Sequence, residues 1–293
     1  MNVFQKFLLF VARPFYGKGY VDKYFPALIG LFKTVYSTSG NGEDIQVDIP
    51  LNLKLIVKSD DIGVGIPLIS KGTYEPLQTK LFLETLKDGD VFFDIGANIG
   101  YYSMLASSKV KNTGKVYSFE PDINNISILE KNIELNNISN IKIIKKAISD
   151  KTGFVNFKSS DISKGDSAIS KNEDKNNISV PSVTLDDFDS QVGVYPNIIK
   201  LDVEGAEIMA LKGASGLFRH VKQPIGLFIE YNPQSLKQVS QVDPLILLNI
   251  LEEYGFKIEY IIDEKSDFLI DYSKVALDGV MKSSTFCNLF ARK

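Results

Sequence analysis

The sequence has very little cysteine and histidine. Cys287 is its only cysteine and His220 its only histidine. A single cysteine excludes a disulfide framework and a cysteine-based metal site. A single histidine excludes a histidine-rich metal site and any mechanism that needs two histidines. His220 follows a helical pattern in the context Leu-Phe-Arg-His-Val, which indicates a surface or helix-end position rather than a catalytic one.

An excess of positive charge is also missing. The 293 residues include 33 Lys and Arg and 36 Asp and Glu, which gives a formal net charge of −3. A nucleic-acid partner normally requires a basic face, so we expect none. The content of 44% hydrophobic and 24% charged residues is ordinary for a globular protein, and the length allows a substantial core.

The chain lacks a long apolar run near its start. Residues 3–12 are apolar but too few to span a bilayer. They also lack the preceding positive cluster and the cleavage site of a secretory signal, which favours a cytoplasmic protein. Phe4, Phe7, Phe10 and Phe15 would give a helix an aromatic face. We expect this face to pack on the domain or on a second copy, as in a homodimer; peripheral membrane contact is the alternative.

Composition divides the chain into an extension and a domain. Residues 1–42 are predicted to form an N-terminal helical extension, which ends in the linker-like stretch Ser-Thr-Ser-Gly-Asn-Gly. Residues 43–293 form the domain. Within it, residues 43–75 are predicted to be a β-hairpin lead-in, because apolar and polar residues alternate over 45–58. Residues 76–293 are predicted to be a Rossmann-like core.

The core pattern alternates strands with helices, which indicates an α/β fold with a mostly parallel sheet covered on both faces. The last two strands follow each other without an obvious helical crossover, so we expect a C-terminal antiparallel hairpin. A plain dinucleotide-binding fold would not have one. The predicted strands are 91–95, 115–120, 141–146, 197–203, 225–231, 256–263 and 286–291. The predicted helices are 98–108, 123–136, 205–218 and 244–254. A small extra pair of strands is predicted at 153–157 and 178–180, around a polar loop, 159–177.

A glycine-bearing turn follows the first core strand. Asp94 ends an apolar run, Gly96, Asn98 and Gly100 follow it, and Glu120 ends the next apolar run. This spacing is typical of a βαβ unit that binds a nucleoside, in which the second acid accepts hydrogen bonds from the ribose hydroxyls. The stretch therefore predicts a nucleoside site at the carboxyl ends of the strands.

The details of this turn favour one kind of nucleoside. In the dinucleotide pattern G-x-G-x-x-G, the second glycine lets the backbone approach a pyrophosphate. Here Asn98 stands at that position, and the Asp94 carboxylate would repel a pyrophosphate but attract a cation. S-adenosylmethionine joins an adenosine to a cationic amino-acid end. We therefore predict S-adenosylmethionine as the cofactor, and a methyltransferase rather than a dehydrogenase.

The fourth core strand carries two charges in an apolar setting. Lys200 and Asp202 alternate onto the same face of this strand. Buried charges are costly unless they pair with each other or with a ligand, so a structural ion pair is one interpretation. The functional interpretation places Asp202 and Glu204 at the floor of the pocket, near the sulfonium and the methyl acceptor.

Methyl transfer from a sulfonium is an in-line displacement that depends on alignment. A hydroxyl acceptor must also lose its proton to a base. The predicted catalytic residues are Asp202, Glu204 and Lys200, with either a carboxylate or Lys200 as the base. Together with Glu230, the two acids could instead hold a divalent cation through oxygen ligands, but we predict no metal site.

Taken together, these motifs resemble the FkbM family of S-adenosylmethionine-dependent methyltransferases. The matching stretches are 72–76, 94–102, 119–121, 147–150, 184–187 and 200–207. The resemblance implies a seven-stranded class I methyltransferase sheet and O-methylation of a hydroxyl on a saccharide or natural-product acceptor. It also implies that Glu75 reaches the amino-acid end of the cofactor. The full predicted cofactor site is Glu75, Asp94, Gly96, Ala97, Asn98, Gly100, Tyr101, Glu120, Pro121, Ala147 and Asp202.

Two other functions fit parts of the pattern. An N-methyltransferase acting on a protein or small amine would need an acidic or aromatic pocket, for which Tyr74, Tyr101, Tyr102 and Tyr231 are available. A non-catalytic nucleoside-binding module is the second alternative. The presence of Asp94, Glu120 and Asp202 together argues against it.

Overall fold

The computed structural model describes residues 42–158, 168–169, 177–265, 267–283 and 286–293. Residues 1–41 of the predicted extension and most of the predicted polar loop 159–177 lie outside these ranges. Among the described residues, none of the helices is both long enough and apolar enough to cross a membrane.

The centre of the molecule is a sheet with the strand order β13-β12-β14-β11-β10-β3-β4-β5. The five strands from β11 to β5 are parallel, and β14 is antiparallel to both of its neighbours, β11 and β12. The strands span Val91–Ile95 (β3), Lys115–Phe119 (β4), Ile141–Ile144 (β5), Ile198–Leu201 (β10), Gly226–Tyr231 (β11), Lys257–Asp263 (β12), Phe268–Asp271 (β13) and Cys287–Arg292 (β14).

All seven predicted strands are present, and the antiparallel arrangement at the C-terminus is confirmed. Its connection differs from a simple hairpin. Strand β13 and helix α13 (Lys274–Ser283) lie between β12 and β14 in the chain, and β13 adds an eighth strand at the edge of the sheet. Neither element was among the predicted ones.

The sheet is buried on both faces, as the alternation of strands and helices predicts. On β3, Phe92 packs against Phe82 at a ring-centroid distance of 5.0 Å, and Phe93 packs against Phe188 at 5.7 Å. Phe82 belongs to α5 (Pro76–Thr85) and Phe188 to α8 (Leu185–Val192). Adjacent residues of one strand therefore belong to two separate hydrophobic clusters, one on each face of the sheet.

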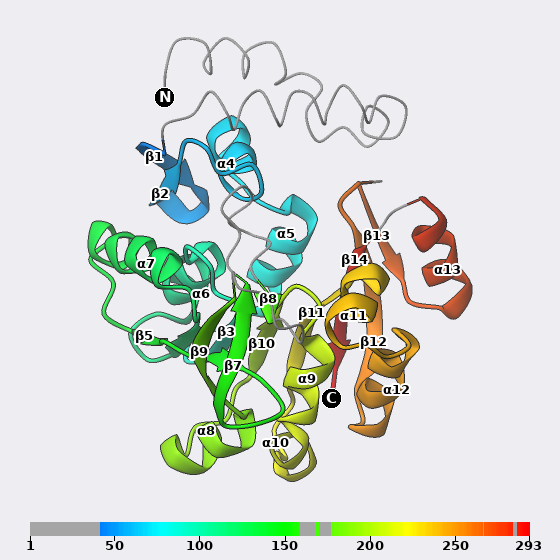
Figure 1. Ribbon diagram of the computed structural model, residues 1–293. Coiled ribbons are helices and arrows are strands. Elements are labelled where there is room, and N and C mark those ends of the chain that lie inside the picture. Colours follow the sequence, from blue (N-terminus) through cyan, green and yellow to red (C-terminus); the bar gives the residue numbers. More distant parts are fainter. Residues whose placement is uncertain (1–41, 159–167, 170–176, 266, 284–285) are drawn as a thin grey trace.

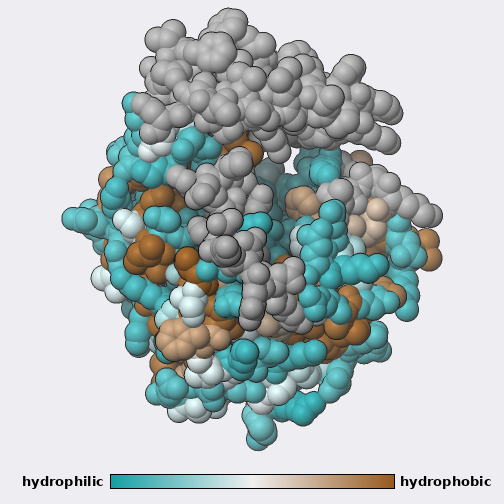
Figure 2. All heavy atoms as spheres, in the orientation of Figure 1, coloured by the Kyte–Doolittle hydropathy of each residue, from teal (hydrophilic) through white to brown (hydrophobic). Residues whose placement is uncertain are grey.

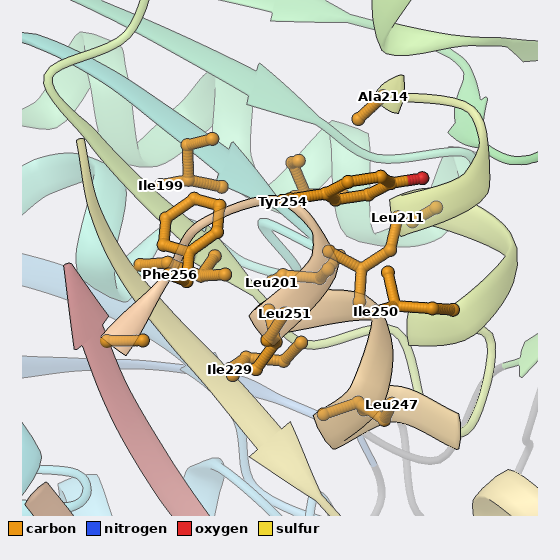
Figure 3. Packing of buried hydrophobic residues seen from close by; sticks show 14 of the residues in the cluster. Ile199, Leu201, Leu211, Ala214, Ile229, Leu247, Ile250, Leu251, Tyr254 and Phe256 are labelled. Atoms are coloured by element: carbon orange, nitrogen blue, oxygen red, sulfur yellow. The ribbon is translucent and has the colours of Figure 1, made fainter. Parts of the chain in front are cut away.

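Different helices pack on the two faces of the sheet. The Phe92 side holds α5, α6 (Tyr101–Val110) and α7 (Ile123–Leu135). The Phe93 side holds α8, α9 (Glu207–Lys212), α10 (Ser215–His220) and α12 (Leu245–Glu253). Figure 3 shows Leu247, Ile250 and Leu251 of α12 packed over Leu201 and Ile229 of the sheet.

One predicted helix is wrong in its extent. The stretch 205–218 forms two helices, α9 and α10, rather than one. The break falls at Gly213, where an added Cβ would lie 2.1 Å from the carbonyl oxygen of Ser149. The close approach of this neighbouring backbone ends the first helix. His220 is exposed at the end of α10, as predicted.

The lead-in forms the predicted antiparallel hairpin. Strands β1 (Asp44–Ile49) and β2 (Leu53–Lys58) are joined by a short 3₁₀ turn, Pro50–Asn52. Asn132 of α7 ties the hairpin to the core, since its Oδ1 accepts from the Ile56 amide at 2.6 Å. Helix α4 (Gly65–Lys71) follows and leads into α5. In Figure 1 this lead-in, in blue and cyan, lies at one end of the molecule.

A second sheet lies beside the main one. Its strand order is β6-β9-β7-β8, with bounds Ala147–Ile148 (β6), Gly153–Lys158 (β7), Ala168–Ile169 (β8) and Ile178–Val183 (β9). Val155 and Phe157 face inward while Phe154 is exposed. On the face shown in Figure 2, hydrophilic residues predominate among the coloured atoms and apolar residues form small patches.

Candidate functional site

A cavity at the carboxyl ends of β3, β4 and β10 collects most of the predicted site residues. Of the predicted set, all but Glu75 and Gly100 line it. The predicted residues that line the cavity are Asp94, Gly96, Ala97, Asn98, Tyr101, Glu120, Pro121, Ala147, Lys200, Asp202 and Glu204.

The two glycines of the turn allow close packing. Gly96 has φ +85°, and an added Cβ would lie 1.8 Å from the carbonyl oxygen of Asp202. Gly100 has φ +92°, and its Cβ would lie 2.3 Å from Leu129 Cδ1 of α7. Gly96 therefore lets the turn approach the end of β10, and Gly100 lets α6 approach α7. Gly100 thus serves the packing of helices rather than the lining of the cavity.

Glu120 lies directly after β4 and holds the glycine turn. Its Oε2 accepts from the Asn98 amide at 2.8 Å and its Oε1 from the Asp122 amide at 2.9 Å. Asn98 itself adopts a left-handed conformation with φ 51°. Burial raises the pKa of Glu120 to about 7, against the lowering effect of these amide hydrogen bonds. Each carboxylate oxygen can accept a second hydrogen bond, so the group can still bind hydroxyl donors.

Asp94 is turned partly toward α6. Its Oδ2 accepts from Ser103 Oγ at 2.5 Å, and Ser103 Oγ lies 2.6 Å from Ser118 Oγ. Burial raises the pKa of Asp94 to about 6, although nearby Lys200 lowers it. Two serines from α6 and β4 therefore orient this buried carboxyl group.

Lys200 is the centre of a charged cluster. Its Nζ donates to Asp202 Oδ2 at 2.6 Å, and its backbone lies in register beside Asp94 on β3. The ammonium also lies 4.7 Å from the ring centroid of Tyr102. Burial opposes the charge, but the carboxylates of Asp202, Glu75 and Asp94 raise the pKa of Lys200 above its ordinary value. Lys200 therefore stays protonated, which disfavours the hypothesis that it is the base.

Glu75 is engaged with protein groups just outside the cavity lining. Its Oε2 accepts from Tyr102 Oη and from Gln78 Nε2, each at 2.8 Å, and its Oε1 accepts from Asn288 Nδ2 at 2.9 Å. Burial raises the pKa of Glu75. The backbone at Glu75 is left-handed, with φ 44°. The neighbouring Tyr74 lines the cavity instead.

The segment after β10 and the end of β11 add further acids. Glu204 lines the cavity and is half-buried. Glu207, at the start of α9, and Glu230, on β11, are buried. Burial raises the pKa of Glu207 to about 7 and that of Glu230 well above its ordinary value. The described residues contain no group of three or more His, Cys, Asp and Glu arranged to hold a metal ion.

Several cavity residues were not among the predicted site residues. Gly63 and Val64 come from the lead-in, and Phe157 and Ile169 from the second sheet. The alternation of side chains along β7 could have suggested that Phe157 is buried. Nothing in the neighbouring sequence links Phe157 to the cavity. Of the tyrosines considered for an aromatic pocket, Tyr74, Tyr101 and Tyr102 line the cavity. Tyr231 is buried elsewhere.

The comparison with known families decides the identity. Residues 94–258 match the Methyltransferase FkbM domain, which is more than half of the chain. The chain belongs to the FkbM methyltransferase family. This FkbM protein is therefore an S-adenosylmethionine-dependent methyltransferase, with the class I methyltransferase fold that the motifs predicted. The match includes the glycine turn, Glu120 and the Lys200–Glu207 stretch, whereas Gly63, Val64 and Tyr74 lie before it.

Individual relatives are distant. Hexuronic acid methyltransferase AglP of Haloferax volcanii is 25% identical over 193 residues, which cover 65% of this chain and 74% of that protein. Methyltransferase FkbM of Methylobacillus flagellatus has a solved structure with 19% identity and a TM-score of 0.43, covering 77% of this chain and 52% of that one. A putative methyltransferase of Streptococcus mutans, solved with SAH, has 11% identity and a TM-score of 0.44, covering 74% and 97%.

Proposed function

We propose that this FkbM protein transfers a methyl group from S-adenosylmethionine to a hydroxyl of a saccharide or similar polyhydroxyl acceptor. The observation that carries the proposal is the charge of the cavity. Asp94, Glu120, Asp202 and Glu204 line it, together with Lys200. A carboxylate-rich site favours a cationic ligand over a pyrophosphate, and S-adenosylmethionine brings both a sulfonium and an α-ammonium group.

The donors and acceptors of the cavity fit this cofactor. We expect Glu120 to accept from the ribose hydroxyls. Around it lie apolar groups suited to an adenine ring: Phe119, Ala147, Ile148, Phe157 and Ile169. The acids at the ends of β3 and β10 suit the cationic end of the molecule. When bound, the cofactor supplies the electrophilic methyl group; the protein aligns the acceptor and removes its proton.

Glu204 is the residue that we assign as the base. Lys200 stays protonated and has no lone pair to offer, and Oδ2 of Asp202 is engaged by Lys200 at 2.6 Å. Glu204 lines the same cavity from the next part of the loop. In this assignment Asp202 and Lys200 shape the charge of the floor, while Glu204 accepts the hydroxyl proton as the methyl group is transferred.

The acceptor side of the cavity is formed by the lead-in. Gly63, Val64 and Tyr74 line the cavity and precede the residues that match the family domain. Tyr74 packs edge-on against Tyr101 at 6.1 Å between ring centroids. An aromatic ring beside carboxylates suits a sugar, which presents both C–H faces and hydroxyls. The description of the relative AglP as a hexuronic acid methyltransferase supports the same class of acceptor.

Methyl incorporation from tritium-labelled S-adenosylmethionine tests this function. Purified protein would be incubated with saccharide, lipid and protein fractions, and with free hexuronic acids as defined acceptors. The proposal predicts label in the saccharide fraction, stable to the conditions that release methyl esters. Label confined to protein or amine acceptors would contradict it and favour N-methylation.

A further inference from the structure

Glu207 is a buried acid outside the cavity lining. It is 0% exposed and follows the cavity residues of the loop after β10. Its Oε1 accepts from the Val203 amide at 3.0 Å and from the Gly205 amide at 3.1 Å. Its Oε2 has no hydrogen-bond partner among the described residues. One oxygen of Glu207 therefore holds both amides that flank Glu204.

The conformation of Glu204 needs such support. Its φ of 52° lies in the left-handed region, which non-glycine residues rarely adopt and which costs energy unless the surroundings impose it. The next residue, Gly205, is held from the other side. Ser240 Oγ donates to the Gly205 carbonyl at 2.8 Å. A Cβ on Gly205 would lie 2.5 Å from the carbonyl oxygen of Ser235, so the loop is packed closely against α11 (Pro233–Val239).

The other end of the loop is equally confined. Asp202 donates its amide to the Ile95 carbonyl at 3.0 Å, and its own carbonyl packs against Gly96 of the glycine turn. The segment from Asp202 to Gly205 is thus anchored at both ends. Glu207 binds the middle, where the side chain of Glu204 enters the cavity.

We propose that Glu207 is a positioning residue that sets Glu204, and through the same loop Asp202, in the cavity. This inference rests on the proposed function, because it takes the two carboxylates as neighbours of the cofactor's cationic end. Glu207 acts as a hydrogen-bond acceptor through Oε1. A glutamine can keep this oxygen and both hydrogen bonds, whereas a methionine of similar volume removes the acceptor.

The test compares two ligands that differ in charge at the reacting centre. S-adenosylmethionine carries a sulfonium, and its demethylated product S-adenosylhomocysteine carries a neutral thioether. The ratio of their dissociation constants therefore reports the carboxylates placed near the sulfur, which a merely structural role of Glu207 would not change. Calorimetric titration of both ligands would be done on wild type, Glu207→Gln, Glu207→Met and the exposed control Glu252→Met.

Glu207→Met is expected to weaken S-adenosylmethionine binding about tenfold more than S-adenosylhomocysteine binding, since loss of two buried hydrogen bonds releases the loop that carries the Glu204 and Asp202 carboxylates. Glu207→Gln and Glu252→Met should keep the wild-type ratio. A ratio in Glu207→Gln that departs from the wild-type ratio would overturn the acceptor role, and this comparison does not require Glu207→Met to fold. An unchanged ratio in folded Glu207→Met would also overturn it. Wild-type protein that binds neither ligand would instead refute the proposed function.

Discussion

Lys200 Nζ and Asp202 Oδ2 lie 2.6 Å apart, and both residues line the cavity. The interpretation of this pair as a structural ion pair is therefore confirmed, and its role in a functional site stays a prediction. Lys200 also lies within the electrostatic influence of Glu75 and Asp94, which raise its pKa along with Asp202. It is the cation that allows several carboxylates to share the floor of one cavity.

Replacement of Lys200 by methionine should strongly destabilise the fold. The lysine side chain is 6% exposed and that of Asp202 20% exposed. Removing one partner of a buried pair leaves uncompensated charge, which costs about 3 kcal/mol or more. Urea unfolding of Lys200→Met measures this cost. Lys145→Met removes an exposed pair with Glu130 and should cost less than about 1 kcal/mol. Equal effects of the two substitutions on the free energy of unfolding would show that the buried Lys200 pair contributes no more to stability than the exposed pair.

Replacement of Glu204 by glutamine should separate catalysis from cofactor binding. Glutamine keeps the size of the side chain but cannot accept the hydroxyl proton. Loss of a general base lowers turnover by about a hundredfold or more. Binding of S-adenosylmethionine loses only one neighbouring carboxylate and should weaken by about tenfold or less, so kcat should fall more than the affinity. Initial rates with labelled cofactor, together with calorimetry on the same variant, give both quantities. A Glu204→Gln enzyme with wild-type kcat would assign the base to another group.

Glu264 should make stability depend on pH. It lies in the turn after β12 and accepts from the amides of Gln78 at 2.8 Å and Leu77 at 3.3 Å, at the start of α5. Burial raises its pKa from an ordinary 4.5 to about 7. Between these pH values the folded state keeps a proton that the unfolded state has lost. This group's contribution to the free energy of unfolding therefore falls as pH rises from 4.5 to 7.

The measurement is urea unfolding across that window for wild type and Glu264→Gln. The variant cannot titrate at this position, so its stability should fall less between pH 4.5 and 7 than that of wild type. Glu252→Gln, at an exposed position of α12, serves as the control and should follow wild type. Parallel curves for wild type and Glu264→Gln would mean that Glu264 does not titrate in this range.

The site residues at the ends of the strands could be predicted from the sequence, and the reason is physical. In a parallel sheet the carboxyl ends of neighbouring strands meet at one edge. Asp94, Glu120 and Asp202 each follow an apolar run that is long enough only for a buried strand. Their approach to one another therefore follows from topology alone, and the structure places all three at one cavity.

Contacts between distant segments could not be predicted in this way. Glu75 accepts a hydrogen bond from Asn288, and Glu264 accepts one from an amide at the start of α5. In both cases tertiary packing decides the partner. The spacing of apolar residues along the sequence carries no information about such contacts. The split between α9 and α10 depends on the backbone of Ser149 approaching Gly213. By contrast, α8 could have been found, because Thr184 caps it by accepting from the Asp187 amide at 3.0 Å.

The most direct test of the central claim is calorimetric titration of S-adenosylmethionine, S-adenosylhomocysteine and NAD into wild type and Glu120→Ala. In the proposed site Glu120 accepts from the ribose hydroxyls, so its loss should weaken binding of both adenosyl ligands by about tenfold or more. The exposed control Glu134→Ala should bind as wild type does. We expect binding of the two adenosyl ligands and none of NAD. Binding of NAD, or equal affinity in wild type and Glu120→Ala, would contradict it.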